Sequence, residues 1–179
     1  MGSVLTKIGT HQEEAKRAMT MLGQDDRTIF IGQQVCYSGS MMFNSLADVP
    51  MEKRIELPIM EETQLGIAIG MSLAGYIPIC IYPRFDFVLL AMNQLVNHLE
   101  KITELSQGEW KPKVIIRSML GRKEPLYPGS QHCGDYTSGF LSLLYRVDVR
   151  KIYQPQHLLP QYRSALNQEG SFLIIEAMR

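Results

Sequence analysis

The sequence predicts a three-layer α/β protein, in which helices cover both faces of a parallel β-sheet. Short, continuously apolar segments alternate along the chain with segments whose apolar residues recur at helical spacing. Strands that are apolar throughout are typical of parallel sheets buried on both faces. The 179 residues suffice for one domain with a substantial core, so we expect residues 1–179 to form a single domain.

The first half of the chain contributes three of the expected strands. A Thr cap at Thr10 and a stop at Gly23 delimit the first helix. β-branched and aromatic residues then indicate a strand, and a segment with Tyr, Ser and Gly indicates a loop. In order, we expect a helix at 10–22, a turn at 25–26, a strand at 28–32, a long surface loop at 33–49, a short strand at 54–57, a helix from Glu61 and a buried strand at 76–81.

The second half continues the alternation. In order, we expect a long helix at 85–105, a strand at 113–118, a loop to residue 134, a helix at 136–145, a strand at 149–153, a helix at 155–167 and a last strand at 171–176. Ligands of such sheets bind beyond the carboxyl ends of the strands. Glu61, residues 82–85 and the loop that carries His132 all follow strands, so we expect them at that edge.

Composition excludes several classes of protein. Eighteen basic residues balance 18 acidic ones, so the chain has no electrostatic footprint for nucleic acid. No segment resembles a secretory signal or a membrane span. The three cysteines are scattered without paired ligand spacing, which is typical of reduced thiols in a cytoplasmic protein. The four histidines have no Cys or acid at ligand spacing, so we expect no metal site; His11, His98 and His157 are interpreted as solvent-facing or structural.

The stretch from Glu61 onward is unusual for a helix. Glu61 and Glu62 open it, and acids in a first turn are common because the helix dipole favours negative charge there. Gly66, Gly70 and Ala74 then recur four apart and therefore share one face. Each glycine costs about 1 kcal/mol relative to alanine. Such a face is suited to a helix whose backbone lies very close to another element.

These residues resemble the pyrimidine-binding domain of transketolase-type thiamine-diphosphate enzymes, nearest to the β subunits of 2-oxoacid dehydrogenase E1 components. The resemblance covers residues 6–177. The matching motifs, in order, are Pro58-Ile59-Met60-Glu61 followed by Gly66 and Gly70, then Gly75 to Cys80, the aromatic run from Tyr82 to Phe87, Gln94 to Asn97, and Gln131-His132. The resemblance implies the pyrimidine domain of the thiamine-diphosphate-binding fold.

The resemblance also implies roles for four residues. Glu61 matches a glutamate that hydrogen-bonds N1′ of the cofactor's aminopyrimidine ring; from residue type alone it would be a helix cap. Phe85 matches an aromatic residue that lies against that ring, with Tyr82 beside it, although both also suit a core position. His132 matches a histidine that faces the substrate, where a neutral imidazole passes protons or binds an oxyanion. A surface-loop histidine is the alternative.

Two departures from the family set further expectations. Gln33 replaces an acid that normally lies near the catalytic glutamate, which puts a carboxylate proton relay in doubt. The chain also ends where the pyrimidine domain ends, without the C-terminal domain of the family. The closest match to the family's Mg²⁺-binding Gly-Asp-Gly motif is Gly134-Asp135-Tyr136, which lacks the second glycine. We therefore expect Mg²⁺ and the diphosphate to be held by a partner subunit.

The resemblance favours one subunit of a split enzyme, active as a two-plus-two heterotetramer. The implied reaction is decarboxylation of a 2-oxo acid with acyl or two-carbon transfer. A second copy of the chain would contact the face of Gly66, Gly70 and Ala74. Two alternatives stay open at this point: a transketolase subunit that moves a ketol unit between sugars, and a non-catalytic assembly subunit, which Gln33 favours slightly.

Overall fold

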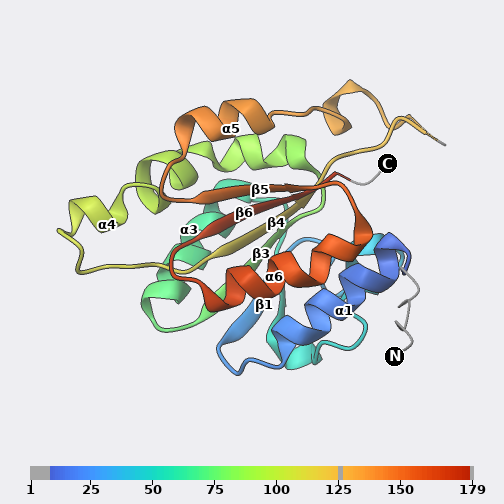
Figure 1. Ribbon diagram of the computed structural model, residues 1–179, viewed down its shortest axis with the longest axis horizontal. Helices are drawn as coiled ribbons and strands as arrows, with labels where there is room; N and C mark the ends of the chain where they lie inside the picture. Colours follow the sequence, from blue (N-terminus) through green and yellow to red (C-terminus); the bar gives the residue numbers. More distant parts are fainter. Residues whose placement is uncertain (1–8, 125–126, 178–179) are drawn as a thin grey trace, which may run out of the picture.

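The structure, a computed structural model, describes residues 9–124 and 127–177. Its centre is a six-stranded, fully parallel sheet in the order β2-β1-β3-β4-β6-β5 (Figure 1). The strands are β1 (Thr28–Gly32), β2 (Arg54–Glu56), β3 (Ile77–Tyr82), β4 (Ile115–Met119), β5 (Asp148–Ile152) and β6 (Phe172–Glu176). The predicted parallel sheet is confirmed, and each predicted strand lies within two residues of its observed bounds.

Helices cover both faces of the sheet, as predicted. One face carries α1 (His11–Gly23), α2 (Met41–Ser45) and α6 (Leu158–Asn167); the other carries α3 (Glu61–Leu73), the 3-10 helix η2 (Phe85–Ala91), the π-helix η3 (Asn93–Leu99) and α5 (Thr137–Leu143). Successive strand residues point to opposite faces. Phe30 and Ile79 therefore join the core under α1 and α6, whereas Ile31 and Cys80 join the core under α3.

The prediction of a plain loop at residues 33–49 is wrong, because this segment contains α2. Ser40 caps the helix by accepting a hydrogen bond from Phe43 N at 3.1 Å. Met42, Leu46 and Val49 are buried, so the segment contributes to the core. The guanidinium of Arg54 donates hydrogen bonds to the carbonyl oxygens of residues 35, 46 and 49. These bonds satisfy carbonyl groups that a buried loop would otherwise leave unpaired.

The predicted helix at 85–105 is helical but not one α-helix. It is divided into η2, η3 and a short α-helix, α4 (Ile102–Leu105). Phe85, Val88 and Ala91 are buried and three residues apart, which matches the three-residue turn of a 3-10 helix. Leu95 and Leu99 are four apart and continue the buried face. The tighter first turns change which side chains face outward.

The remaining helices agree with expectation apart from their ends. Thr10 and Glu13 form a capping box at the start of α1, with Thr10 N donating to Glu13 Oε2 at 2.7 Å. The predicted helix at 155–167 begins with a 3-10 turn, η5 (Pro155–His157), before α6. Two further 3-10 turns are η1 (Met51–Lys53) and η4 (Ser130–His132).

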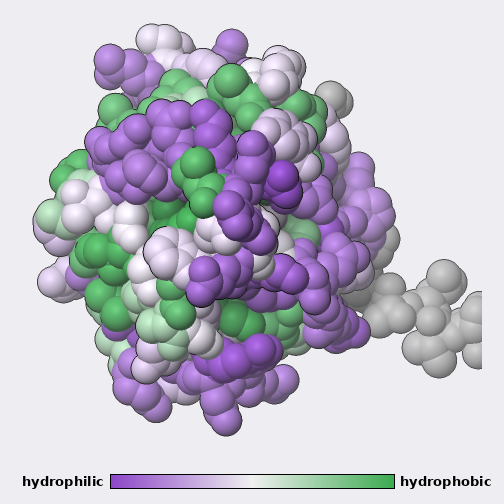
Figure 2. Space-filling view, turned by 90° about the vertical axis from the view of Figure 1, so that its left-hand side faces the viewer, coloured by the Kyte–Doolittle hydropathy of each residue, from purple (hydrophilic) through white to green (hydrophobic). Residues whose placement is uncertain are grey.

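The two ends of the sheet differ in character. The amino-terminal ends of the strands lie on the side of α4, which Figure 2 shows as a mixed surface of hydrophilic and hydrophobic residues. Leu105 and Trp110, from α4 and the loop after it, are among its exposed apolar residues. The strands run from there to the opposite edge of the sheet, at their carboxyl ends. Ligands of parallel sheets bind at that edge. Among the described residues no helix is both long and apolar enough to cross a bilayer.

Candidate active site

A cavity of about 440 Å³ lies at the carboxyl edge of the sheet. The segments that follow β1, β2 and β3 supply most of its wall, and the loop after β4 supplies the rest. Its lining residues are Gln33, Gln34, Ile59, Glu61, Pro83, Arg84, Phe87, Leu90 and His132. The structure thus brings Glu61 and His132 together in one cavity, at the edge where the order of strands predicts a ligand.

Glu61 is the first residue of α3 and is only 8% exposed. The helix is capped by the backbone of Met60, and no side chain makes a capping hydrogen bond. Within the described residues the Glu61 carboxylate has no hydrogen-bond or ion-pair partner, because only its backbone oxygen is bonded, by Tyr82 Oη at 2.9 Å. Buried carboxylates are normally paired. An unpaired one that lines a cavity is suited to binding a ligand.

His132 is held against the cavity by its loop. Gly121 allows a close approach, since a Cβ there would lie 1.6 Å from the carbonyl oxygen of His132. On the other side of the loop, Asp86 Oδ1 accepts a hydrogen bond from Gly134 N at 3.0 Å. The imidazole packs edge-on against Phe87, with ring centroids 5.5 Å apart. Its Nδ1 is buried without a partner in the described chain, so a hydrogen-bonding position of the ring is unfilled.

Phe87, rather than Phe85, is the aromatic residue that lines the cavity. Phe85 is fully buried and packs against Phe140, with ring centroids 5.1 Å apart. Tyr82 is also fully buried, and this burial raises its pKa well above the ordinary value. Neither residue lines the cavity, and their ring-contact role stays a prediction. The apolar residues Phe85, Val88 and Ala91, three apart and all buried, were the signal that Phe85 belongs to the core, and sequence reasoning missed it.

The amide of Gln33, the residue in place of the family's acid, has a fixed orientation. Gln64 Nε2 donates to the Ile81 carbonyl at 2.9 Å, so Gln64 presents its oxygen to Gln33. Gln33 Nε2 donates to that oxygen at 2.7 Å and to the Pro58 carbonyl at 3.1 Å. Backbone carbonyls only accept, so this chain of bonds leaves the Gln33 oxygen as the atom available to the cavity.

The neighbouring residue, Gln34, adopts a left-handed backbone conformation, with φ of 61°. Such a conformation is uncommon for a residue other than glycine and persists where its surroundings enforce it. Here the Glu56 carboxylate accepts hydrogen bonds from the backbone N–H groups of residues 34, 35 and 36, at 2.7, 2.7 and 2.8 Å. The end of β2 thus fixes the wall of the cavity that follows β1.

Asp135, the residue of the partial Gly-Asp motif, has other partners. Its Oδ1 accepts hydrogen bonds from Thr137 N and Oγ1 at 3.2 and 2.6 Å, and its Oδ2 pairs with Lys151. Among the described residues there is no group of three or more His, Cys, Asp or Glu that could hold a metal ion. Cys36, Cys80 and Cys133 are free. Asp135 therefore organises the start of α5.

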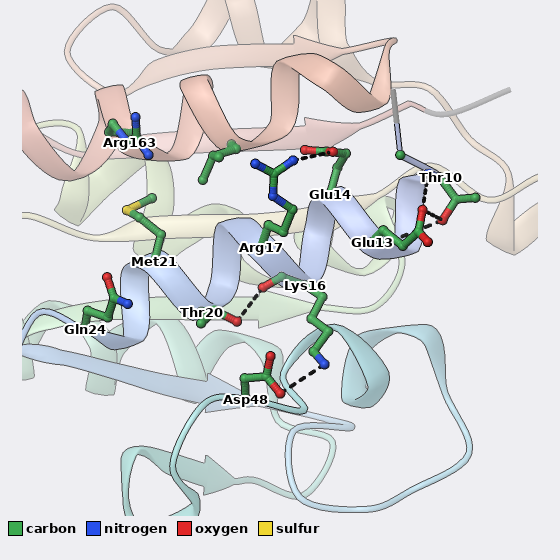
Figure 3. Close-up of a pocket in the computed structure, with 12 residues that line it drawn as sticks. Thr10, Glu13, Glu14, Lys16, Arg17, Thr20, Met21, Gln24, Asp48 and Arg163 are labelled. Atoms are coloured by element: carbon green, nitrogen blue, oxygen red, sulfur yellow. Dashed lines mark hydrogen bonds and ion pairs between the residues drawn. The ribbon is translucent and has the colours of Figure 1, made fainter. Parts of the chain in front are cut away.

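A larger cavity, about 890 Å³, lies between α1 and α6, away from these residues (Figure 3). Several of its charged residues pair with one another: Lys16 Nζ lies 3.0 Å from Asp48 Oδ1, and Arg17 lies 2.8 Å from Glu14. None of the predicted site residues lines this cavity. We therefore assign the candidate site to the smaller cavity, where the unpaired carboxylate of Glu61 lies.

The small-residue face of α3 is open. No atom lies within 4 Å of a Cβ built at Gly70, and Ala74 is exposed. Ile67 and Leu73 on the same helix are 40% and 42% exposed. Gly66 is nearer the chain, since a Cβ there would lie 3.5 Å from the Gln94 side chain. Gly70 and Ala74 are thus available to another molecule, as the proposed contact with a second copy requires.

Comparisons with known proteins agree with the resemblance stated from the sequence. No family model matches the chain. It is 31% identical over 142 residues to the mitochondrial β subunit of the pyruvate dehydrogenase E1 component of Saccharomyces cerevisiae, covering 77% of this chain and 38% of the relative. It is 28% identical over 119 residues to the β subunit of 3-methyl-2-oxobutanoate dehydrogenase of Mycobacterium tuberculosis, covering 64% and 34%. The chain thus spans little more than a third of the length of these relatives.

Among solved structures, the chain is similar to a split-gene transketolase in an inactive β4 tetramer, with a TM-score of 0.72 and 19% identity. The match covers 93% of this chain and 51% of that one. The chain is therefore an α/β protein whose fold is similar to that of this transketolase. In sequence, the chain is similar to the β subunits of pyruvate dehydrogenase E1 over most of its own length and over a part of theirs. The predicted resemblance is confirmed.

Proposed function

We propose that this chain supplies the pyrimidine half of a thiamine-diphosphate site in a split enzyme, for decarboxylation of a 2-oxo acid with acyl or two-carbon transfer. The observation that carries the proposal is the nearly buried, unpaired carboxylate of Glu61 in a cavity with Phe87 and His132. A carboxylate with no protein partner fits a ring that brings its own hydrogen-bonding nitrogen. The E1 β relatives favour a 2-oxo acid as substrate.

Each residue has a defined task in this proposal. When bound, the cofactor supplies a thiazolium carbon that adds to the substrate carbonyl and stabilises the charge left by decarboxylation. Glu61 holds a proton at the ring's N1′, and Phe87 provides an aromatic surface for that ring. His132 passes a proton to, or hydrogen-bonds, the reacting oxygen. Mg²⁺ and the diphosphate belong to a partner subunit, and the assembly is a two-plus-two heterotetramer.

Replacement of Glu61 by Gln tests the proposal. The amide cannot take up the N1′ proton, so exchange of the cofactor's C2 proton should slow by about 10²-fold or more. Proton NMR in deuterated buffer measures this exchange, with Mg²⁺ and the diphosphate-binding partner present.

Glu62→Gln is the matched control for this experiment. Glu62 lies in the same helical turn but is exposed, and its carboxylate accepts a hydrogen bond from Asn93 at 3.0 Å. Its replacement should leave the exchange rate unchanged. Wild-type exchange in Glu61→Gln would mean that Glu61 only begins a helix, and would favour the alternative of a non-catalytic assembly subunit.

A further inference from the structure

A second cavity, about 330 Å³, adjoins the candidate active site. The two cavities share Gln34, Pro83 and Arg84 in their walls. Among the described residues that line the second cavity, Arg84 alone carries a charge. We propose that Arg84 and this second cavity bind the anionic group of the substrate, a carboxylate or a phosphate. This inference rests on the proposed function and names a determinant of its substrate.

The charge of Arg84 is not neutralised within the described chain. Its guanidinium makes one hydrogen bond, from Nη1 to the carbonyl oxygen of Pro83 at 3.2 Å, and no carboxylate lies at ion-pair distance. Two other arginines show the contrast. Arg117 pairs with Glu176 at 2.7 Å, and Arg54 donates to three backbone carbonyls. Arg84 keeps most of its donors for a ligand, in the planar arrangement that suits carboxylate and phosphate.

The position of Arg84 is set by the fold. It follows β3 directly and stands immediately before η2, where Pro83 restricts the backbone. The side chain is half-buried, so its charge acts in partly desolvated surroundings, where attraction to an anion is stronger than in water. An anion at Arg84 would lie at the junction of the two cavities, with the rest of the ligand free to enter the cavity of Glu61.

Part of the remaining wall of the second cavity suits a short hydrocarbon segment, beside the polar residues Gln34 and Ser40. Met41, Met42 and Met119 line it, and Met42 and Met119 are buried. Methionine side chains are apolar and adapt to irregular shapes. The ligand class is therefore a small organic anion with an apolar part, held by Arg84 at its charged end.

Titration of the isolated chain tests this inference, because all the lining residues come from one chain and neither cofactor nor partner is needed. The probes are pyruvate, inorganic phosphate and methyl pyruvate, which is the uncharged ester. The Arg84 Nε–Hε resonance should shift saturably with one or both anions and not with the ester. Arg84→Met should weaken anion binding at least about tenfold, and Arg84→Lys should weaken it less. Arg163→Met is the control, since Arg163 is exposed and lies in the cavity between α1 and α6.

The outcomes separate the two sources of the anion. Tighter binding of pyruvate indicates a carboxylate, and tighter binding of phosphate indicates a phosphate ester. Equal binding of methyl pyruvate, an equal loss in Arg163→Met, or no binding of either anion would overturn the inference. Circular dichroism of both Arg84 variants checks that they are folded. Anion binding at Arg84 together with normal C2 exchange in Glu61→Gln would retain this subsite and reject only the proposed role of Glu61.

Discussion

At the scale of single residues, the site depends on which polar atoms the protein itself leaves unused. Glu61 and His132 could be assigned to one place from sequence, because both follow strands of a parallel sheet. Phe87 was not, although Phe85 and Phe87 are two residues apart and so face different sides of the helix; which of the two faces the cavity depends on how η2 packs against the sheet. The orientation of the Gln33 amide was equally out of reach, because it depends on the carbonyl oxygens of Pro58 and Ile81, which are distant in sequence.

The hydrogen bonds of the Gln33 amide predict how the stability of the protein would change if the family's acid stood at this position. In Gln33→Glu, a carboxylate would face the Pro58 carbonyl and the Gln64 amide oxygen, both acceptors that Gln33 now satisfies. Gln64 is buried, whereas the bond to Pro58 is exposed, and loss of the donor to a buried acceptor costs about 1–3 kcal/mol. We expect the free energy of unfolding at neutral pH to fall by that amount, as measured by urea denaturation. Gln131→Glu, at an exposed position, should change it by less than about 0.5 kcal/mol.

Equal stability of Gln33→Glu and wild type would contradict the fixed amide orientation. It would also mean that the cavity accepts the family's acid without rearrangement.

At the scale of elements, the spacing of apolar residues predicted where most helices lie. It did not predict whether a helical segment is an α-helix, a 3-10 helix or a π-helix. The 85–105 segment was predicted from apolar spacing, and the spacing of its buried residues changes from three in η2 to four in η3. The α2 helix was missed because it is only five residues long. Its Ser40 cap is visible in the sequence, but its burial depends on Arg54, which binds the surrounding carbonyl groups.

The open face of α3 predicts that a bulky side chain placed there prevents assembly. Gly70→Leu meets no atom within 4 Å of its Cβ, and leucine favours a helix more than glycine does by about 1 kcal/mol, so the isolated chain should stay folded. The added bulk should hold a facing helix away and prevent assembly. Sedimentation with and without the partner subunit measures the mass that is lost. Gly139→Leu, at another open helical glycine on α5, is the matched control.

If Gly70→Leu assembled as wild type does, the contact between two copies through Gly66, Gly70 and Ala74 would have to be abandoned. The assignment of Glu61 would be unaffected, because it depends on the cavity and not on this face.

At the scale of the whole molecule, sequence indicated the layers but not the order of the strands. Local patterns identify strands, whereas their order follows from pairings between distant segments. Charged residues in β5 agree with its place at the edge of the sheet, where such residues discourage further pairing. His11 was interpreted as solvent-facing or structural; it is structural, because its Nε2 lies 2.8 Å from Glu176 Oε2. A buried partner 165 residues away leaves no local signal in the sequence.

Glu176 joins five elements through one buried network. Its carboxylate binds Arg117 from β4 at 2.7 Å, Tyr162 from α6 at 2.7 Å and His11 from α1, and Arg117 continues to Ser45 of α2 at 2.7 Å. Burial raises the pKa of Glu176, but the Arg117 charge and the hydrogen bonds from His11 and Arg117 outweigh it, and the pKa falls from 4.5 to about 2. A carboxylate with a lowered pKa stabilises the fold most when it is ionised.

This network predicts how the whole protein responds to acid. The contribution of Glu176 should be complete above pH 4.5 and decline as the pH falls toward about 2, by about 3 kcal/mol in total. Glu176→Gln leaves the buried Arg117 unpaired, so its free energy of unfolding at pH 7 should fall by about 3–5 kcal/mol. Its further loss between pH 4.5 and 3 should be smaller than that of wild type. Urea denaturation across this pH range measures both, with Glu109→Gln, at an exposed position, as the control. An equally steep loss in Glu176→Gln and wild type would show that other carboxylates set the acid limit of the fold.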